Sequence, residues 1–182
     1  MKLKLNNVRL AFPVLFEAKT VNGDGKPAFS ASFLLDPADP QVKALNQAIE
    51  QVAKDKWGAK AEAILKQMRA QDKVALHDGD LKANYDGFPG NLYVSARSAT
   101  RPLVIDKDKS PLTEQDGKPY AGCFVNASVE LWAQDNNYGK RINASLRGVQ
   151  FFKDGDAFAG GGAASEDEFD DIAEGATADD LV

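Results

Sequence analysis

A long alternation of apolar and polar residues between positions 123 and 151 limits what this chain can fold into. The alternation covers residues 123–131, stops at the turn-forming stretch 135–139, and resumes over residues 142–146. Period-two alternation on both sides of a turn predicts a β-hairpin with one face in a core. Gly148 then shifts the phase of the returning strand, which indicates a β-bulge.

Shorter strand patterns precede the hairpin. Apolar residues alternate over positions 3–10 but change phase at Asn6–Asn7, which predicts a strand with a bulge. A second strand is predicted around residues 29–35, a third over 92–97 and a short fourth over 103–105. The chain is therefore rich in strands, and some of them bend.

A helical block separates the early strands from the later ones. Asp39 and Pro40 provide an N-cap and a proline at the first helical position. The apolar spacing that follows predicts helices over 40–57 and 59–70, interrupted at Gly58. Strands with bulges suit a small, strongly bent sheet that closes on itself. We therefore expect a mainly β barrel of the oligonucleotide-binding (OB) type, with an inserted helical segment.

The charges of the chain are segregated. Ten of its 27 acidic residues lie after Lys153, where there is no Lys or Arg, so the first 153 residues carry the other 17 acids against all 22 bases. The glycine run 160–162 is followed by a polar stretch with few large apolar residues, which predicts a linker and a disordered acidic tail. We expect an OB-type body at residues 1–157, with the helical insertion at about 39–70, and the linker and tail at 158–182.

Such a tail has two expected roles. A polyanion tethered to a body with excess positive charge competes with nucleic acid for the same surface. Its free tip would bind protein partners through Asp179, Asp180, Leu181 and Val182. A tail that serves only solubility is the alternative.

Aromatic and cationic side chains share the polar faces of the predicted strands. Single-stranded nucleic acid binds to such surfaces because bases stack on rings and phosphates attract cations. The candidate nucleic-acid-binding residues are Tyr93, Arg97, Phe124, Trp132, Arg141 and Arg147. For Phe124 and Trp132 a core position is an equal alternative, and either Arg141 or Arg147 could instead pair with Glu130.

The scarcity of histidine and cysteine argues against catalysis and metal binding. The chain has one histidine, His77, which excludes a histidine-rich metal centre. It has one cysteine, Cys123, which excludes a cysteine-built zinc site and an internal disulfide. His77, Asp78 and Asp80 could hold a divalent metal, but the same residues suit an ordinary turn. We expect no catalytic residue, no metal and no cofactor.

Four segments of the body form a recognisable combination: residues 7–13 (NVRLAFP), 29–36 (FSASFLLD), 120–126 (YAGCFVN) and 148–155 (GVQFFKDG). Together with the glycine linker and the acidic tail, they resemble a family of phage single-stranded-DNA-binding proteins first catalogued as a domain of unknown function. The resemblance implies an OB-fold body and a protein-recruiting acidic C-terminus. Tails of the better-studied proteins usually end on an aromatic residue, whereas this one ends on Leu181–Val182.

The sequence thus predicts a phage protein that binds single-stranded DNA, or single-stranded RNA, without sequence preference during replication or recombination. Its tail would recruit phage or host replication and recombination proteins. No apolar run is long enough to cross a membrane, and we expect the protein in the cytoplasm of the bacterial host. Two alternatives stay open: a metal-dependent nuclease around His77, Asp78 and Asp80, and an interaction adaptor that binds no DNA.

Overall fold

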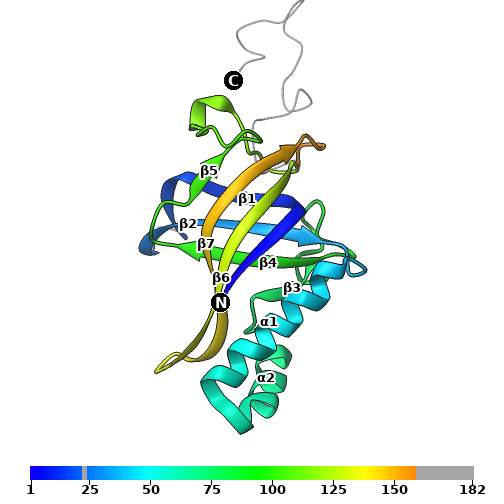
Figure 1. The fold of residues 1–182 in the computed structure, drawn as a ribbon, viewed down its shortest axis with the longest axis vertical. Coiled ribbons are helices and arrows are strands. Elements are labelled where there is room, and N and C mark those ends of the chain that lie inside the picture. Colours follow the sequence, from blue (N-terminus) through cyan, green and yellow to red (C-terminus); the bar gives the residue numbers. More distant parts are fainter. Residues whose placement is uncertain (22–23, 159–182) are drawn as a thin grey trace, which may run out of the picture.

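The computed structural model describes residues 1–21 and 24–158. Their elements, shown in Figure 1, are β1 (Lys2–Val21), β2 (Asp24–Leu35), α1 (Pro40–Trp57), η1 (Gly58–Lys60), α2 (Ala61–Ala70), β3 (Leu76–Asp78), η2 (Gly79–Lys82), β4 (Leu92–Ser98), β5 (Leu103–Ile105), η3 (Glu114–Asp116), β6 (Phe124–Asn136) and β7 (Gly139–Lys153). The Gly160–Gly162 linker and the acidic tail lie outside the described residues. No helix in the described ranges is long and apolar enough to cross a membrane.

Five of the strands close into a barrel. In the order β4-β2-β1-β6-β7, each strand pairs with the next in antiparallel fashion. Strands β4 and β7 then pair in parallel at Arg97 and Ser145, which closes the ring. Strand β3 extends the sheet beside β4, and β5 extends it beside β7 (Figure 1). The expected mainly β barrel of the OB type with an inserted helical segment is confirmed.

The barrel interior is filled by the apolar residues that the alternation predicted. Phe29, Ala31, Phe33 and Leu35 of β2 are all buried, and Phe33 is completely inaccessible. The long hairpin adds its own inward residues, which alternate from Cys123 along β6 and back along β7. Full burial of each large apolar side chain stabilises the fold by roughly 1.5–3 kcal/mol. The hairpin prediction is confirmed, although the strands run further into the turn than expected, to Asn136 and from Gly139.

Bulges allow the long strands to curve around the barrel. Both predicted bulges are present: the pairing of β1 with β6 shifts beside Asn7, and the pairing of β6 with β7 shifts beside Gly148. A further bulge in β1 was not predicted. It lies at Phe12, whose φ is 49°. Each bulge adds local bend and twist to its strand.

The two helices end close to the residues that the sequence predicted for them. The carboxylate of Asp39 accepts a hydrogen bond at 2.9 Å from the backbone N–H two residues later, which caps α1. Helix α1 buries Leu45 and Ile49 and lies next to β6 (Figure 1). At its end, Trp57 Nε1 donates a hydrogen bond to Asp135 Oδ2 at 2.9 Å, which joins the helix to the hairpin and lowers the pKa of Asp135.

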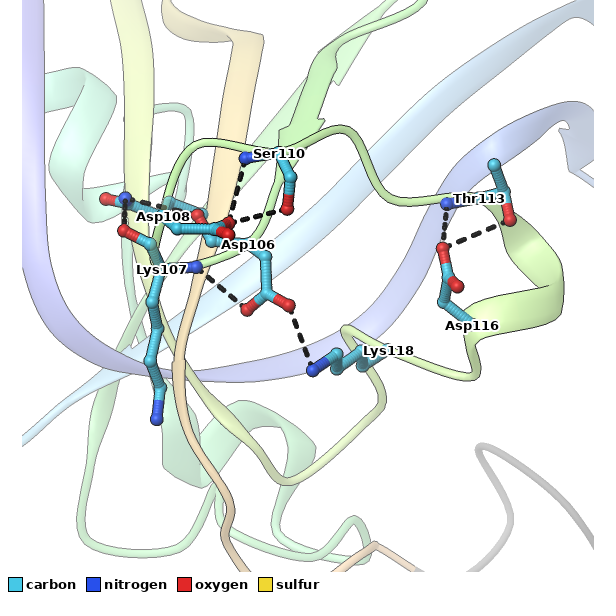
Figure 2. Close-up of polar contacts among 8 residues, drawn as sticks. Asp106, Lys107, Asp108, Ser110, Thr113, Asp116 and Lys118 are labelled. Carbon is cyan, nitrogen blue, oxygen red and sulfur yellow. Dashed lines mark hydrogen bonds and ion pairs between the residues drawn. The ribbon is translucent and has the colours of Figure 1, made fainter.

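The loop between β5 and β6 is held by its own carboxylates, as Figure 2 shows. Asp106 accepts a hydrogen bond from the backbone N–H of Lys107 at 2.8 Å and forms an ion pair with Lys118 Nζ at 3.0 Å. Asp108 accepts hydrogen bonds from the hydroxyl and the backbone N–H of Ser110. The bond from Lys107 lowers the pKa of Asp106, and the bond from the Ser110 hydroxyl lowers the pKa of Asp108.

Candidate nucleic-acid interface

A groove runs along the outside of the barrel where β4 meets β7. Its cavity volume is about 630 Å³, and its walls come from the start of β2, the segment after α2, and strands β3, β4, β6 and β7. We name it the Trp132 groove. Its Lys, Arg and Trp lining side chains are Lys26, Lys73, Arg97, Arg141 and Trp132.

The charged residues that line the Trp132 groove are all basic. Lys26, Lys73, Arg97 and Arg141 line it, and none of its lining residues is Asp or Glu. Arg97 Nη2 donates a hydrogen bond to the carbonyl of Lys26 at 3.3 Å, which holds the guanidinium against the wall. A cleft lined by charge of one sign concentrates the electrostatic field and attracts ligands of opposite charge. The groove is therefore suited to a polyanion.

Trp132 adds an exposed aromatic ring to these cations. It lies on β6 opposite Asn143 of β7, and 44% of its surface is exposed. The amide of Asn143 donates a hydrogen bond to Gln134 Oε1 at 2.9 Å, so these two polar neighbours bond to each other. The indole ring provides a flat apolar surface on which a base can stack.

Closure of the barrel is what builds the groove. Arg97 of β4 pairs with Ser145 of β7, and the segment after α2 lies along the same seam. The backbone N–H of Ile142 donates a hydrogen bond to the carbonyl of Lys73 at 3.0 Å, which fixes that segment beside β7. Side chains from distant parts of the sequence thus reach one surface.

The groove brings together three of the six predicted residues: Arg97, Trp132 and Arg141. Lys26 and Lys73 join them and were not predicted, because their local sequence does not distinguish them from other surface lysines. They can be identified only from the pairing of distant segments, which the folded barrel shows and the local sequence does not.

Tyr93 is buried, with 4% of its surface accessible. It packs with Ala11, Leu34 and Phe88 in a small apolar cluster outside the barrel, and its ring stacks on His77 at 4.9 Å between centroids. Burial raises the pKa of the Tyr93 hydroxyl. Its ring therefore presents no open face to a base.

Phe124 and Arg147 lie outside the groove lining. Phe124 is half-buried near the opposite end of β6 from Trp132, about 26 Å away along the strand. Lys153 Nζ lies 4.8 Å from the centroid of the Phe124 ring. Arg147 is exposed on β7, and its Nη1 is 3.8 Å from Glu130 Oε2, so this arginine forms the predicted alternative ion pair.

A family comparison identifies the class of protein. A sequence model of the family described as "Enterobacter phage Enc34, ssDNA-binding protein" matches residues 1–182, the full sequence. The chain belongs to this family. A relative named "Putative protein p50", from Acyrthosiphon pisum secondary endosymbiont phage 1, is 53% identical over 175 residues, which are 94% of each chain.

Solved structures of phage proteins share the fold. The single-stranded DNA-binding protein from bacteriophage Enc34 in complex with ssDNA has a TM-score of 0.73 and 28% identity, covering 86% of this chain and 88% of that one. A C-terminal truncation of the Enc34 protein has a TM-score of 0.71 and 27% identity with the same coverage. Gp2.5 of bacteriophage T7, a single-stranded DNA binding protein, has a TM-score of 0.54 at 13% identity, covering 84% and 91%, and shares the fold alone.

The Enc34 family is a class of DNA-binding proteins and not of enzymes, which confirms the expectation of no catalytic activity. The residues of the nuclease alternative, His77, Asp78 and Asp80, form hydrogen bonds with nearby parts of the chain. His77 Nδ1 lies 2.6 Å from Asp72 Oδ1, Asp78 accepts a hydrogen bond from the N–H of Asp80, and Asp80 accepts one from the N–H of Gly90. Over residues 1–21 and 24–158 there is no group of three or more potential metal ligands.

Proposed function

We propose that this protein binds single-stranded DNA in the Trp132 groove, without sequence preference, during the replication or recombination of phage DNA. One observation carries the proposal: an exposed indole ring shares a basic groove with four cations, and no carboxylate lines that groove. The family supports it, since the Enc34 protein has been solved in complex with ssDNA.

The groove supplies both kinds of contact that a single strand needs. A base stacks on Trp132, and this contact tolerates every base because each has a π-face. Arg97 and Arg141 contact phosphates, to which a planar guanidinium can donate two hydrogen bonds at once. Lys26 and Lys73 add positive charge to the same groove. Each of these contacts is to a base face or a phosphate, so binding is independent of sequence.

We further propose that the acidic tail, residues 158–182, competes with DNA for this groove. Support comes from the place where the described chain ends. Phe158 packs against the apolar cluster that contains Leu34 and Phe88, and its N–H donates a hydrogen bond to the carbonyl of Ala121 at 3.0 Å. The 24 residues after Phe158 span up to about 80 Å when extended, which is enough chain to reach the groove.

The tip of the tail has a separate proposed role. When DNA occupies the groove, the tip Asp179, Asp180, Leu181 and Val182 is released to bind phage or host replication and recombination proteins. The acidic residues would pair with basic residues of the partner, and the two apolar residues would occupy a small pocket. The site of action would be the cytoplasm of the bacterial host.

A salt-titrated binding curve tests the main proposal. The full chain is titrated with a fluorescent oligothymidylate at several salt concentrations, and then with a mixed-sequence strand and an RNA strand of the same length. We expect the logarithm of the binding constant to fall with the logarithm of salt, with a slope of about −0.7 for each phosphate contact. Four cations in the groove correspond to a slope of about −3. Equal affinity for the two DNA strands would support binding without sequence preference.

Two results would contradict the proposal. One is an absence of binding to any single strand at low salt, which would favour the adaptor alternative. The other is binding that does not change with salt, because a basic groove that neutralises phosphates releases counterions.

A further inference from the structure

A second aromatic surface lies outside the Trp132 groove. Phe12 of β1 and Tyr85 of the loop after η2 are 37% and 45% exposed, and their rings meet edge to face at 5.0 Å between centroids. Leu81 of η2 is 62% exposed. Lys82 Nζ lies 5.6 Å from the centroid of the Phe12 ring. We name Phe12, Lys82 and Tyr85 the Phe12–Tyr85 patch.

An unusual backbone conformation exposes Phe12. Its φ of 49° lies in the left-handed region, which is rare for a bulky aromatic residue. Leu10 points into the barrel, so strict alternation would point Phe12 inward as well. The bulge between Ala11 and Val14 instead puts the ring on the outer surface. Such strain is found at functional sites, where the surrounding structure holds it in place.

A series of aromatic contacts runs from the patch to His77, one of the residues that line the Trp132 groove. His77 lines the groove and stacks on Tyr93 at 4.9 Å. Tyr93 contacts Phe88 at 5.0 Å, and Phe88 contacts Phe12 at 5.6 Å between ring centroids. The series therefore runs from the Phe12–Tyr85 patch to His77 in the wall of the groove, and Lys82 Nζ lies 5.3 Å from the ring of Tyr93 within it.

We infer that the Phe12–Tyr85 patch is a second stacking subsite for single-stranded DNA, reached by a strand that leaves the Trp132 groove past His77. This inference rests on the proposed function. The patch combines exposed rings with a cation, as stacking surfaces for single strands do. OB folds bind about 4–16 nucleotides, so a strand of ordinary site size extends beyond a single stacked base.

Oligonucleotide length separates the two subsites. Binding of oligothymidylates from about 4 to about 16 nucleotides is measured for the unaltered chain and for Tyr85→Ala. We expect Tyr85→Ala to weaken binding of the longest strand by about fivefold to a hundredfold, the loss of one stacked base. Binding of the shortest strand, held in the Trp132 groove, should not change.

Three controls define the contact. Tyr85→Phe keeps the ring and should bind like the unaltered chain. Leu81→Ala removes an exposed aliphatic side chain and no ring, and it should also leave binding unchanged. A strand with 2-aminopurine at either end reports stacking directly, because its emission is quenched on a ring, and Tyr85→Ala should relieve that quenching. Thermal unfolding of each variant shows whether the fold is kept. If Tyr85→Ala lowers the unfolding temperature, Lys82→Gln is measured in its place, and it should reduce the salt slope by about 0.7.

The contrary outcomes are distinct. If Trp132→Ala weakens binding but Tyr85→Ala and Lys82→Gln leave every length unchanged, the proposed function stands and the second subsite is refuted. The patch would then be a surface for a protein partner. Equal losses in Tyr85→Ala and Leu81→Ala would also refute stacking, because only one of them removes a ring. If the unaltered chain binds no strand, both proposals fail.

Discussion

The backbone of Arg97 pairs with that of Ser145 across the seam between β4 and β7, and the Arg97 side chain lines the groove beside that seam. Barrel closure and the proposed binding surface therefore use different atoms of the same residue. The backbone closes the ring, while the guanidinium is held at the groove by the carbonyl of Lys26. Replacing the side chain should change binding and leave the fold intact.

Substitutions that remove the positive charge of one arginine test whether the side chain acts in binding and not in the fold. Arg97→Gln and Arg141→Gln should each reduce the slope of log binding constant against log salt by about 0.7, because each removes one phosphate contact. Arg147→Gln is the matched control on the same strand as Arg141. Arg147 pairs with Glu130 outside the groove lining, so its loss should change the slope less. An equal change in all three variants would show that general surface charge, not the groove, binds the strand.

The ring of Trp132 is tested by truncation. Trp132→Ala should weaken binding to single-stranded DNA by roughly 1–3 kcal/mol, the contribution of one stacked base. Trp132→Phe should retain part of that energy because a smaller ring still stacks. Since 44% of the Trp132 surface is exposed, thermal unfolding should change little. A variant that unfolds early while binding normally would instead make Trp132 a structural residue.

Local sequence patterns predicted most of the barrel. The alternation at Phe29, Ala31, Phe33 and Leu35 placed one face of β2 correctly, because inward residues repeat every second position whatever the strand pairs with. Asp39 predicted the start of α1 correctly because the capping hydrogen bond joins residues only two positions apart. These features depend on neighbours in the chain and can be predicted from them.

The site was harder to predict because its residues meet only after long-range pairing. Tyr93 lies on the outer face of β4, where alternation predicts exposure, but Phe88 from the preceding loop covers it. Lys26 and Lys73 reach the groove through closure of the barrel, which no local pattern specifies. Phe12 faces outward because its backbone is left-handed. Glycine and asparagine are the residues that usually indicate this conformation, and neither stands at position 12. Each difference comes from contacts between distant segments.

The loop in Figure 2 gives a pH dependence with a defined sign. The hydrogen bond from Lys107 lowers the pKa of Asp106 below its usual 3.8 in the folded protein. The charged carboxylate therefore stabilises the fold at pH values above 3.8, and this contribution is lost as the pH falls through the folded pKa. Between pH 6 and pH 3, the unfolding temperature should fall by less in Asp106→Asn than in the unaltered chain. Parallel curves for the two proteins would contradict this assignment.

Removal of the acidic tail tests its proposed competition with DNA. Deleting residues 160–182 should tighten binding to single-stranded DNA, because eight carboxylates no longer compete with phosphates for the groove. The gain should be largest at low salt, where the Debye length exceeds about 10 Å and screening is weakest. The described body ends in the Phe158 contact with the barrel, so its unfolding temperature should stay the same.

A full-length variant separates tail charge from tail length. Replacing the eight acidic residues after Gly160 with Asn or Gln keeps the chain but removes its charge. If competition is electrostatic, this variant should bind DNA as tightly as the deletion, and both should exceed the unaltered chain. If only the deletion binds more tightly, the tail obstructs the groove by its bulk. If neither does, the tail does not compete with DNA, and its proposed role is limited to Asp179, Asp180, Leu181 and Val182 as a binding site for partner proteins.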